Sequence, residues 1–97
     1  RGALGAAVID GKLYAVGGTN GSNTQNNKLE VYDPQTDTWS TKADMPTTRD
    51  SLAAAAIDGK LYVAGGFKSG DININKLEVY DPQTGAWATK ANMPTGR

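Results

Sequence analysis

The chain has 97 residues, and its ten Lys and Arg balance its ten Asp and Glu, so the net charge at pH 7 is zero. Proteins that bind nucleic acid through its phosphates carry an excess of basic residues, so this class of partner is not expected. The absence of cysteine and histidine excludes disulfides, thiol catalysis, Cys/His zinc sites and Ser-His-Asp triads. We predict no cofactor and no metal site.

The longest apolar run, Leu52 to Ile57, is far too short to span a bilayer. We therefore expect no membrane partner. No charged-then-apolar leader is visible at the start of the sequence, so no secretory signal is predicted. The lack of cysteine fits an oxidising compartment and the cytosol equally well, which leaves the localisation open.

The sequence is one unit written twice, with each landmark recurring 48 residues later. VIDGKLYAVGG (8–18) recurs as AIDGKLYVAGG (56–66), and the stretch 28–49 recurs with few changes at 76–97. Such a period indicates a repeat architecture, in which one unit does not bury its own hydrophobic faces. Two units are fewer than such folds normally need, so the chain is predicted to associate with copies of itself. The predicted units are residues 1–48 and 49–97.

Each unit opens with a short alanine-rich apolar run, Leu4 to Ile9 in the first and Leu52 to Ile57 in the second. Alanine alone would favour a helix. However, an Asp-Gly pair follows each run, at Asp10 and Asp58, and separates it from a second apolar stretch. This pattern is typical of a two-residue hairpin with positive φ at both turn positions. The second strands of the two hairpins are predicted at Leu13 to Val16 and Leu61 to Ala64.

A Gly-Gly pair ends each second strand, at Gly17-Gly18 and Gly65-Gly66. Paired glycines can form a phosphate-binding loop, but no G-x-G-x-x-G or G-K-[ST] pattern follows them. We interpret them as strand ends that need an unusual φ or a close backbone approach. The segments that follow differ between the units and are predicted to be loops, Thr19 to Asn27 and Phe67 to Asn75.

The third strands, Leu29 to Tyr32 and Leu77 to Tyr80, place Leu and Val on one face and Glu and Tyr on the other. An Asp-Pro-Gln-Thr turn follows, and a fourth strand begins near Trp39 or Trp87. Each unit is therefore an all-β, four-stranded antiparallel meander with two partly apolar faces. Such sheets can stack around an axis as a propeller. The alanine-rich first strand then fits the narrow axis, while Tyr and Trp fill the wider outer gap.

These ordered landmarks resemble the kelch repeat: Gly-Gly, then a tyrosine, then a tryptophan seven residues later, within V-Y-D-P-x-T-x-x-W, and a Met-Pro-x-x-Arg ending. The resemblance implies two kelch-type β-propeller blades, of which a ring normally holds roughly six or seven. We therefore expect a ring completed by oligomerisation, most simply a homotrimer with six blades. The residues that carry the structural motif are Gly17, Gly18, Tyr32, Trp39, Gly65, Gly66, Tyr80 and Trp87.

The resemblance also implies a ligand face that takes a protein or peptide partner. In kelch substrate adaptors the segments after Gly-Gly and the turns after Met-Pro form one face that binds peptides. Phe67 and Arg49 are the strongest candidates, because aromatic and Arg side chains dominate interface energetics. A structural role is the competing interpretation for Arg49, which recurs as Arg1 and Arg97. The candidates are Thr19, Asn20, Thr48, Arg49, Asp50, Ser51, Phe67, Lys68, Gly96 and Arg97.

We expect no enzymatic activity and no catalytic residue. Carboxylates such as Asp10, Glu30 and Asp33 recur in both units, which is typical of turn and edge residues. A catalytic pair needs two different environments instead. The family's copper radical oxidases need His and Cys ligands that this sequence lacks. Three alternatives stay open: a piece of a longer natural kelch array, an engineered repeat protein with no ligand, and, more weakly, a hydrolase or isomerase active in a central channel.

Overall fold

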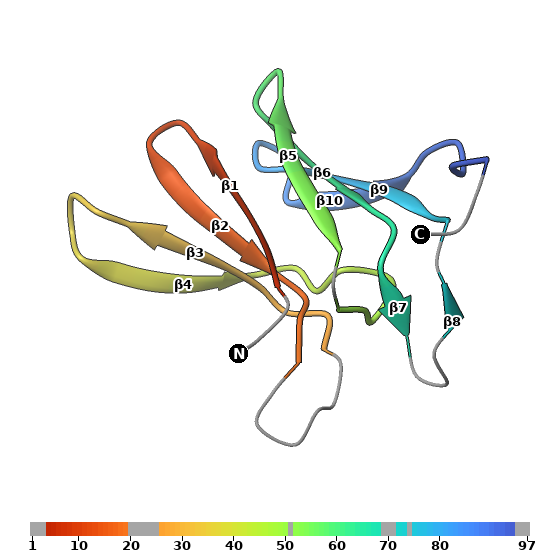
Figure 1. Ribbon diagram of the computed structural model, residues 1–97. Helices are drawn as coiled ribbons and strands as arrows, with labels where there is room; N and C mark the ends of the chain where they lie inside the picture. Colours follow the sequence, from red (N-terminus) through yellow and green to blue (C-terminus); the bar gives the residue numbers. More distant parts are fainter. Residues whose placement is uncertain (1–3, 20–25, 51, 69–71, 74, 95–97) are drawn as a thin grey trace.

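The computed structural model describes residues 4–19, 26–50, 52–68, 72–73 and 75–94. Over these residues the chain is all-β, with two four-stranded sheets and one two-stranded sheet. Figure 1 shows the two large sheets side by side, the first in red to yellow and the second in green to blue. Within the same residues no helix is long and apolar enough to cross a membrane.

Each large sheet is an antiparallel meander, as the sequence predicts. The strands of the first sheet follow chain order, β1-β2-β3-β4, and those of the second are arranged β5-β6-β9-β10. The strands of the first sheet are β1 (Gly5–Ile9), β2 (Lys12–Val16), β3 (Leu29–Asp33) and β4 (Thr38–Lys42). The later strands are β5 (Ala53–Ile57), β6 (Lys60–Ala64), β7 (Phe67–Lys68), β8 (Ile72–Asn73), β9 (Leu77–Asp81) and β10 (Ala86–Thr89).

The Asp-Gly pairs form the tight hairpin turns that their position predicts. Asp10 and Gly11 have φ values of 51° and 74°, and Asp58 and Gly59 have values of 51° and 76°. Positive φ at both central residues is the mark of the turn whose twist matches a β-hairpin. These turns fix the register between the first two strands of each sheet, with Ile9 opposite Lys12 in the first.

The turn between β3 and β4 is held by the aspartate that precedes the proline. The Asp33 carboxylate accepts a hydrogen bond from the backbone N–H of Gln35 at 2.9 Å. The backbone carbonyl of Asp33 accepts a second one from the backbone N–H of Asp37 at 2.8 Å. Asp37 has a φ of 57°, and Gly85 occupies the same place in the second sheet with a φ of 69°. The turn therefore needs a left-handed residue at this point, and aspartate tolerates that conformation better than most residues.

The prediction of a plain loop from Phe67 to Asn75 is wrong in part. Phe67–Lys68 (β7) and Ile72–Asn73 (β8) form a short antiparallel ladder, with Phe67 opposite Asn73 and Lys68 opposite Ile72. Aromatic and β-branched residues such as Phe67 and Ile72 favour strands. The corresponding first loop, Thr19 to Asn27, lies largely outside the described residues.

The hydrophobic core lies between the two large sheets. Val16 and Leu29 of the first sheet and Leu61 and Val63 of the second have no exposed surface. The first strands of the sheets, β1 and β5, contact each other directly. A Cβ at Gly5 would collide with Leu52 and lie 3.0 Å from the Cβ of Ala54. The small residues of the first strands therefore allow the close approach that the sequence predicts for the inner edge of the sheets.

Among the residues that the structure describes, one face of each large sheet has no other sheet packed against it. On the first sheet the row Val8, Leu13, Tyr32 and Trp39 faces away from the second sheet, and we call this side the head face. On the second sheet the outward side carries Ala55, Tyr62, Val79 and Ala88 in register, together with Ile57, and we call it the tail face. The head row of the first sheet matches Ala56, Leu61, Tyr80 and Trp87 of the second, and of these Leu61, Tyr80 and Trp87 belong to the core between the sheets or pack against it.

Equivalent residues differ in exposure because only one face of each sheet is covered. Leu61 is fully buried, whereas Leu13 is 36% exposed, and Ile9 is 4% exposed, whereas Ile57 is 51% exposed. Trp39 is 57% exposed, so it fills no packed gap within a single chain, and its place in a gap between the blades of a ring stays a prediction. The physical reason is that no part of the described chain lies over the head face. Its equivalent Trp87 packs against the core.

Candidate ligand-binding face

Backbone hydrogen bonds bring together the two kinds of segment that were predicted to form a ligand face. The N–H of Gly18 donates to the carbonyl of Arg49 at 2.9 Å, which joins the Gly-Gly strand end to the segment after Met-Pro. The N–H of Met45 donates to the carbonyl of Asn27 at 2.8 Å. These segments therefore lie side by side at one end of the strands. The Asp10-Gly11 hairpin lies at the opposite end of β1 and β2.

The glycine pairs are required by both conformation and space. Gly17 and Gly66 have φ values of 68° and 96°, which L side chains rarely adopt. A Cβ at Gly17 would lie 2.7 Å from the carbonyl oxygen of Arg49, and one at Gly66 would lie 2.5 Å from that of Asp50. The segment after Met-Pro can thus pass directly over the strand ends, which places the candidate residues 48–50 beside the Gly-Gly pairs.

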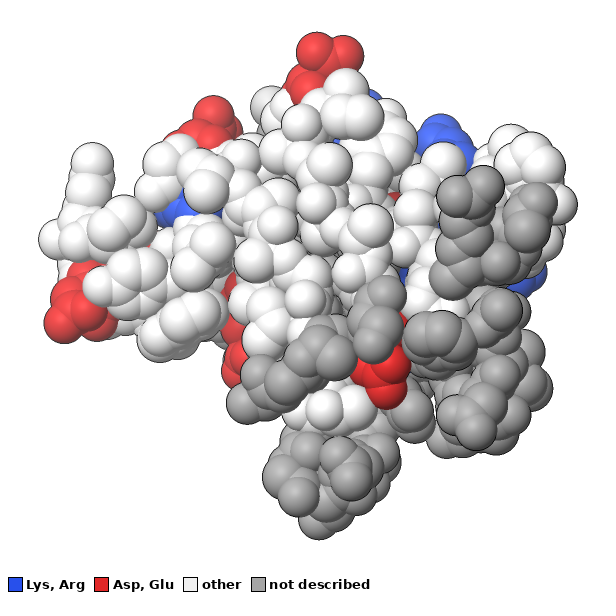
Figure 2. Space-filling view, in the orientation of Figure 1, with Lys and Arg blue, Asp and Glu red and all other residues white. Residues whose placement is uncertain are grey.

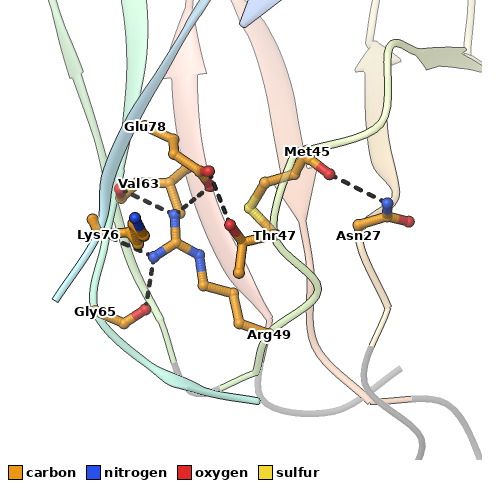
Figure 3. A network of polar contacts seen from close by, with 8 residues as sticks. All are labelled: Asn27, Met45, Thr47, Arg49, Val63, Gly65, Lys76 and Glu78. Atoms are coloured by element: carbon orange, nitrogen blue, oxygen red, sulfur yellow. Dashed lines mark hydrogen bonds and ion pairs between the residues drawn. The ribbon is translucent and has the colours of Figure 1, made fainter. Parts of the chain in front are cut away.

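Arg49 lies inside the interface between the two large sheets (Figure 3). Its Nη1 donates to the carbonyls of Gly65 at 2.9 Å and Lys76 at 3.1 Å. Its Nη2 donates to the carbonyl of Val63 at 3.3 Å and to the Glu78 carboxylate at 2.7 Å. The side chains of Arg49 and Glu78 are 0% and 2% exposed. The guanidinium therefore ties the linker between the sheets to the ends of β6 and β9.

The expectation that Arg49 presents an exposed guanidinium to a ligand is accordingly wrong. The competing structural interpretation matches its burial and its partners. Burial lowers the pKa of the Arg49 guanidinium, and the negative charge of Glu78 acts in the opposite direction. Arg is suited to such a place, because its planar group can satisfy several acceptors at once.

The other candidate ligand-face residues differ in their exposure, and some lie outside the described residues. Thr48 is exposed, and Thr19 and Asp50 are half-buried. The backbones of Phe67 and Lys68 belong to β7, at the end of the strands that carries the Gly-Gly pair. The candidates that lie outside the described residues are Asn20, Ser51, Gly96 and Arg97.

Sequence reasoning did not single out Glu78, which pairs with Arg49, or the role of Thr47. The hydroxyl of Thr47 donates to the second oxygen of the Glu78 carboxylate at 2.9 Å, so both oxygens of this buried group are engaged. A signal was present in the sequence. An arginine ends each Met-Pro segment and a glutamate recurs at the same place in each third strand, so the two could be paired.

A groove of about 350 Å³ opens between the sheets at the end opposite to the predicted ligand face. Lys12, Tyr14 and Lys42 line it from the first sheet, and Tyr80 and Pro82 line it from the second. Burial raises the pKa of the Tyr14 and Tyr80 phenols, and a nearby negative charge acts in the same direction on each. Both phenols are therefore neutral donors at physiological pH.

Charged side chains are dispersed over the face of the molecule that Figure 2 shows, with broad uncharged areas between them. In the described ranges no three His, Cys, Asp or Glu residues are grouped so that they could hold a metal ion. Lys28 and Asp44 form an exposed ion pair at 3.6 Å. The surface thus shows neither a basic stripe nor an acidic cluster in this view.

Comparison with known proteins gives a consistent result. The family model described as the Kelch motif matches twice, over residues 1–46 and 48–94. Three F-box/kelch-repeat proteins of Arabidopsis thaliana, one of them named putative, are 56% identical over 36 residues, 43% over 35 and 51% over 45. The matches cover 35%, 36% and 46% of this chain, but only 10%, 9% and 12% of those proteins.

A solved structure, that of YjhT, superimposes with a TM-score of 0.79 at 27% sequence identity. The superposition covers 98% of this chain and 29% of the YjhT chain. The chain therefore spans about a tenth of the length of the curated relatives that it matches and less than a third of that structure.

Proposed function

Because the chain belongs to the kelch-repeat family, we propose that it is a non-enzymatic binding scaffold whose two blades are completed to a closed β-propeller by further copies of itself. Three copies would give six blades. The ring would present the loops after Gly-Gly and the turns after Met-Pro to a protein or peptide ligand. The resemblance to F-box/kelch-repeat proteins supports an interaction role. The recurrence of the carboxylates Asp10, Glu30 and Asp33 in both units supports structural rather than catalytic roles for them.

One observation supports the proposed assembly. The face that is buried in one blade is the equivalent of the face that is exposed in the other. Leu61 and Ile9 are buried at the contact between the blades, whereas Leu13 and Ile57 are exposed on the head and tail faces. Two different complementary faces at opposite ends of a subunit make a head-to-tail contact, and repetition of that contact closes a ring when the rotation fits. Exposed apolar faces of this kind otherwise promote aggregation.

The assembly is tested by light scattering coupled to size-exclusion chromatography, supported by native mass spectrometry. We expect a mass about three times the 10.2 kDa of one chain. A tetramer would keep the principle and correct the number of blades. A folded monomer that stays monomeric at high concentration would contradict the proposal, since its uncovered faces would then need no partner.

A second candidate is that these residues belong to a longer kelch array. It is favoured by the short share of each relative that the chain covers, about a tenth. The head and tail faces would then be covered by neighbouring repeats of the same polypeptide. The mass measurement distinguishes the self-assembled ring from the piece of a longer array. We expect an isolated piece of an array to aggregate or remain unfolded rather than to form a closed ring of defined mass.

The ligand face is tested by a peptide-library screen on the assembled protein, repeated with variants. Phe67→Ala and Thr48→Ala alter the proposed face, whereas Gln35→Ala and Gln83→Ala alter the turns at the other end and serve as controls. We expect the first pair to weaken binding at least tenfold and the second pair to leave it unchanged. The reverse pattern would place the ligand at the opposite end, where the groove between the blades lies.

A further inference from the structure

The contact between the two blades of one chain is a template for a contact between chains. At its outer end the indole Nε1 of Trp87 donates to the carbonyl oxygen of Ala43 at 2.8 Å. Beside it, the rings of Tyr80 and Tyr14 lie 6.4 Å apart across the interface. The second blade therefore supplies a tyrosine and a tryptophan, and the first blade supplies a carbonyl oxygen and a tyrosine.

The donor half of this contact exists a second time, on the head face. Trp39 and Tyr32 are the equivalents of Trp87 and Tyr80. The rings of Tyr32 and Trp39 lie 5.2 Å apart at 48°, and those of Tyr80 and Trp87 lie 5.3 Å apart at 51°. The exposed rings of Tyr32 and Trp39 thus already have the same relative arrangement as the packed rings of Tyr80 and Trp87. Binding through it requires no rearrangement of the aromatic rings, which lowers the cost of association.

The acceptor half also exists a second time, on the tail face. A half-groove of about 260 Å³ lies there, open to solvent. The complete groove is lined by Ile9 and Asp10, whose equivalents do not line the half-groove, and it has the corner formed by Tyr80, Pro82 and Gln83 of the following blade, which the half-groove lacks. The equivalent corner, Tyr32, Pro34 and Gln35, belongs to the blade that carries the head face. The residues lining the half-groove include Lys60, Tyr62, Val79, Asp81 and Lys90, which match Lys12, Tyr14, Val31, Asp33 and Lys42 of the complete groove.

Resting on the proposed ring, we infer that the head face of one copy docks on the tail face of the next in the register seen between the blades. Trp39 Nε1 then donates to the carbonyl of Ala91 in the next copy, and the corner at Pro34 completes the groove at Tyr62. The occupant of both uncovered faces is a second copy of this chain, because each face lacks what the other presents. The contact is heterologous, so head does not pair with head.

A cysteine pair reports this register directly, since the chain has no cysteine of its own. A Cβ at Gly5 would lie 3.0 Å from the Cβ of Ala54 across the blade contact. One repeat further along, the same geometry places Ala53 of one copy opposite Ala6 of the next. Both alanines are exposed in the single chain. Such proximity is close to the Cβ separation of roughly 3.5–4.5 Å found in disulfides.

We expect the double variant Ala6→Cys/Ala53→Cys to form covalent dimers and closed trimers under mild oxidation, seen on non-reducing gels. The matched controls are the single variants Ala6→Cys and Ala53→Cys, which should form no covalent oligomer while keeping the mass of the parent ring. Dimers from Ala6→Cys alone would show a head-to-head contact and overturn the inference. An oligomer that does not cross-link in the double variant would also overturn it.

Complementation of two blocked variants provides a second test. Trp39→Glu places a charge in the centre of the head face, and Ile57→Glu places one in the tail face. Each variant alone should be a monomer at concentrations where the parent is a ring. A mixture should give a one-to-one heterodimer and nothing larger, because one head and one tail remain intact. Thr48→Glu adds the same charge outside both faces and should leave the ring unchanged.

The outcomes separate this inference from the proposed function. A monomeric parent chain refutes the ring itself. A parent ring that tolerates both Trp39→Glu and Ile57→Glu refutes the register but leaves the ring standing. Two monomeric variants that do not combine when mixed refute the head-to-tail contact. Circular dichroism of each variant establishes that it is folded before its mass is interpreted.

Discussion

The guanidinium of Arg49 lies 2.7 Å from the carboxylate of Glu78, and both side chains are buried between the two blades. The arginine comes from the linker between the blades, and the glutamate comes from β9 of the second. Three backbone carbonyls and the hydroxyl of Thr47 complete the network. The carbonyl of Arg49 also accepts a hydrogen bond from the N–H of Gly18 in the first blade, so Arg49 is bonded to both blades.

We predict that Arg49→Ala destabilises the folded chain by about 3–5 kcal/mol, since it leaves the Glu78 carboxylate buried without its counter-charge. Urea denaturation followed by tryptophan fluorescence measures the loss. Lys28→Ala removes one member of the exposed pair with Asp44 and should cost less than about 1 kcal/mol. Equal losses at the two sites would show that the buried pair does not hold the blades together.

The two tryptophans should respond differently to truncation. Trp87→Ala removes a ring packed against the core and its hydrogen bond to Ala43, so we expect a loss of roughly 3 kcal/mol in the stability of the subunit. Trp39→Ala should leave the stability of the dilute subunit almost unchanged and shift the mass toward monomer. Thermal melts at low and high protein concentration, together with light scattering, distinguish these effects. Similar behaviour of both variants would contradict the assignment of one to the blade contact and the other to the head face.

Glycine positions should separate backbone strain from crowding. A Cβ at Gly59 meets no atom within 4 Å, so Gly59→Ala should cost only the strain of a positive φ, about 1–2 kcal/mol. Gly66→Ala adds a collision with the carbonyl of Asp50 and should cost clearly more. Chemical denaturation of the two variants gives the comparison. A smaller loss at Gly66 would mean that the Met-Pro segment does not cross the strand end as described.

Stability should fall at alkaline pH. Burial raises the pKa of Tyr80 above the ordinary value for tyrosine, and the charge of Asp81 acts in the same direction. The unfolded chain therefore loses this proton at lower pH than the folded chain does. The stabilisation is fully present below about pH 10 and is lost as the pH rises from there through the folded pKa. The free energy of unfolding of Tyr80→Phe, measured between pH 8 and 11, should fall less steeply than that of the parent. Parallel curves would contradict it.

Local chemistry accounts for the parts of the fold that were predictable from the sequence. The Asp-Gly turns and the alternation in β3 and β9 follow from neighbouring residues, and the 48-residue period shows that the same pattern occurs twice, so together they predict the two meanders. The burial of Arg49 was harder to predict, because its four partners come from residues 14 to 29 positions away. The exposure of Trp39 depends on which face another blade covers. An individual unit contains no information on that, since both units have the same tryptophan.

Each chain would contribute blades to such a ring in pairs, because one polypeptide joins two unlike copies of the unit. A ring built from whole copies then has an even number of blades, so this chain cannot form a seven-bladed ring. The β7–β8 arm of the second unit would recur at every second blade, alternating with the different segment of the first. A trimer would present each of the two surfaces three times. A ligand with several matching epitopes could then bind by avidity well above the affinity of a single face.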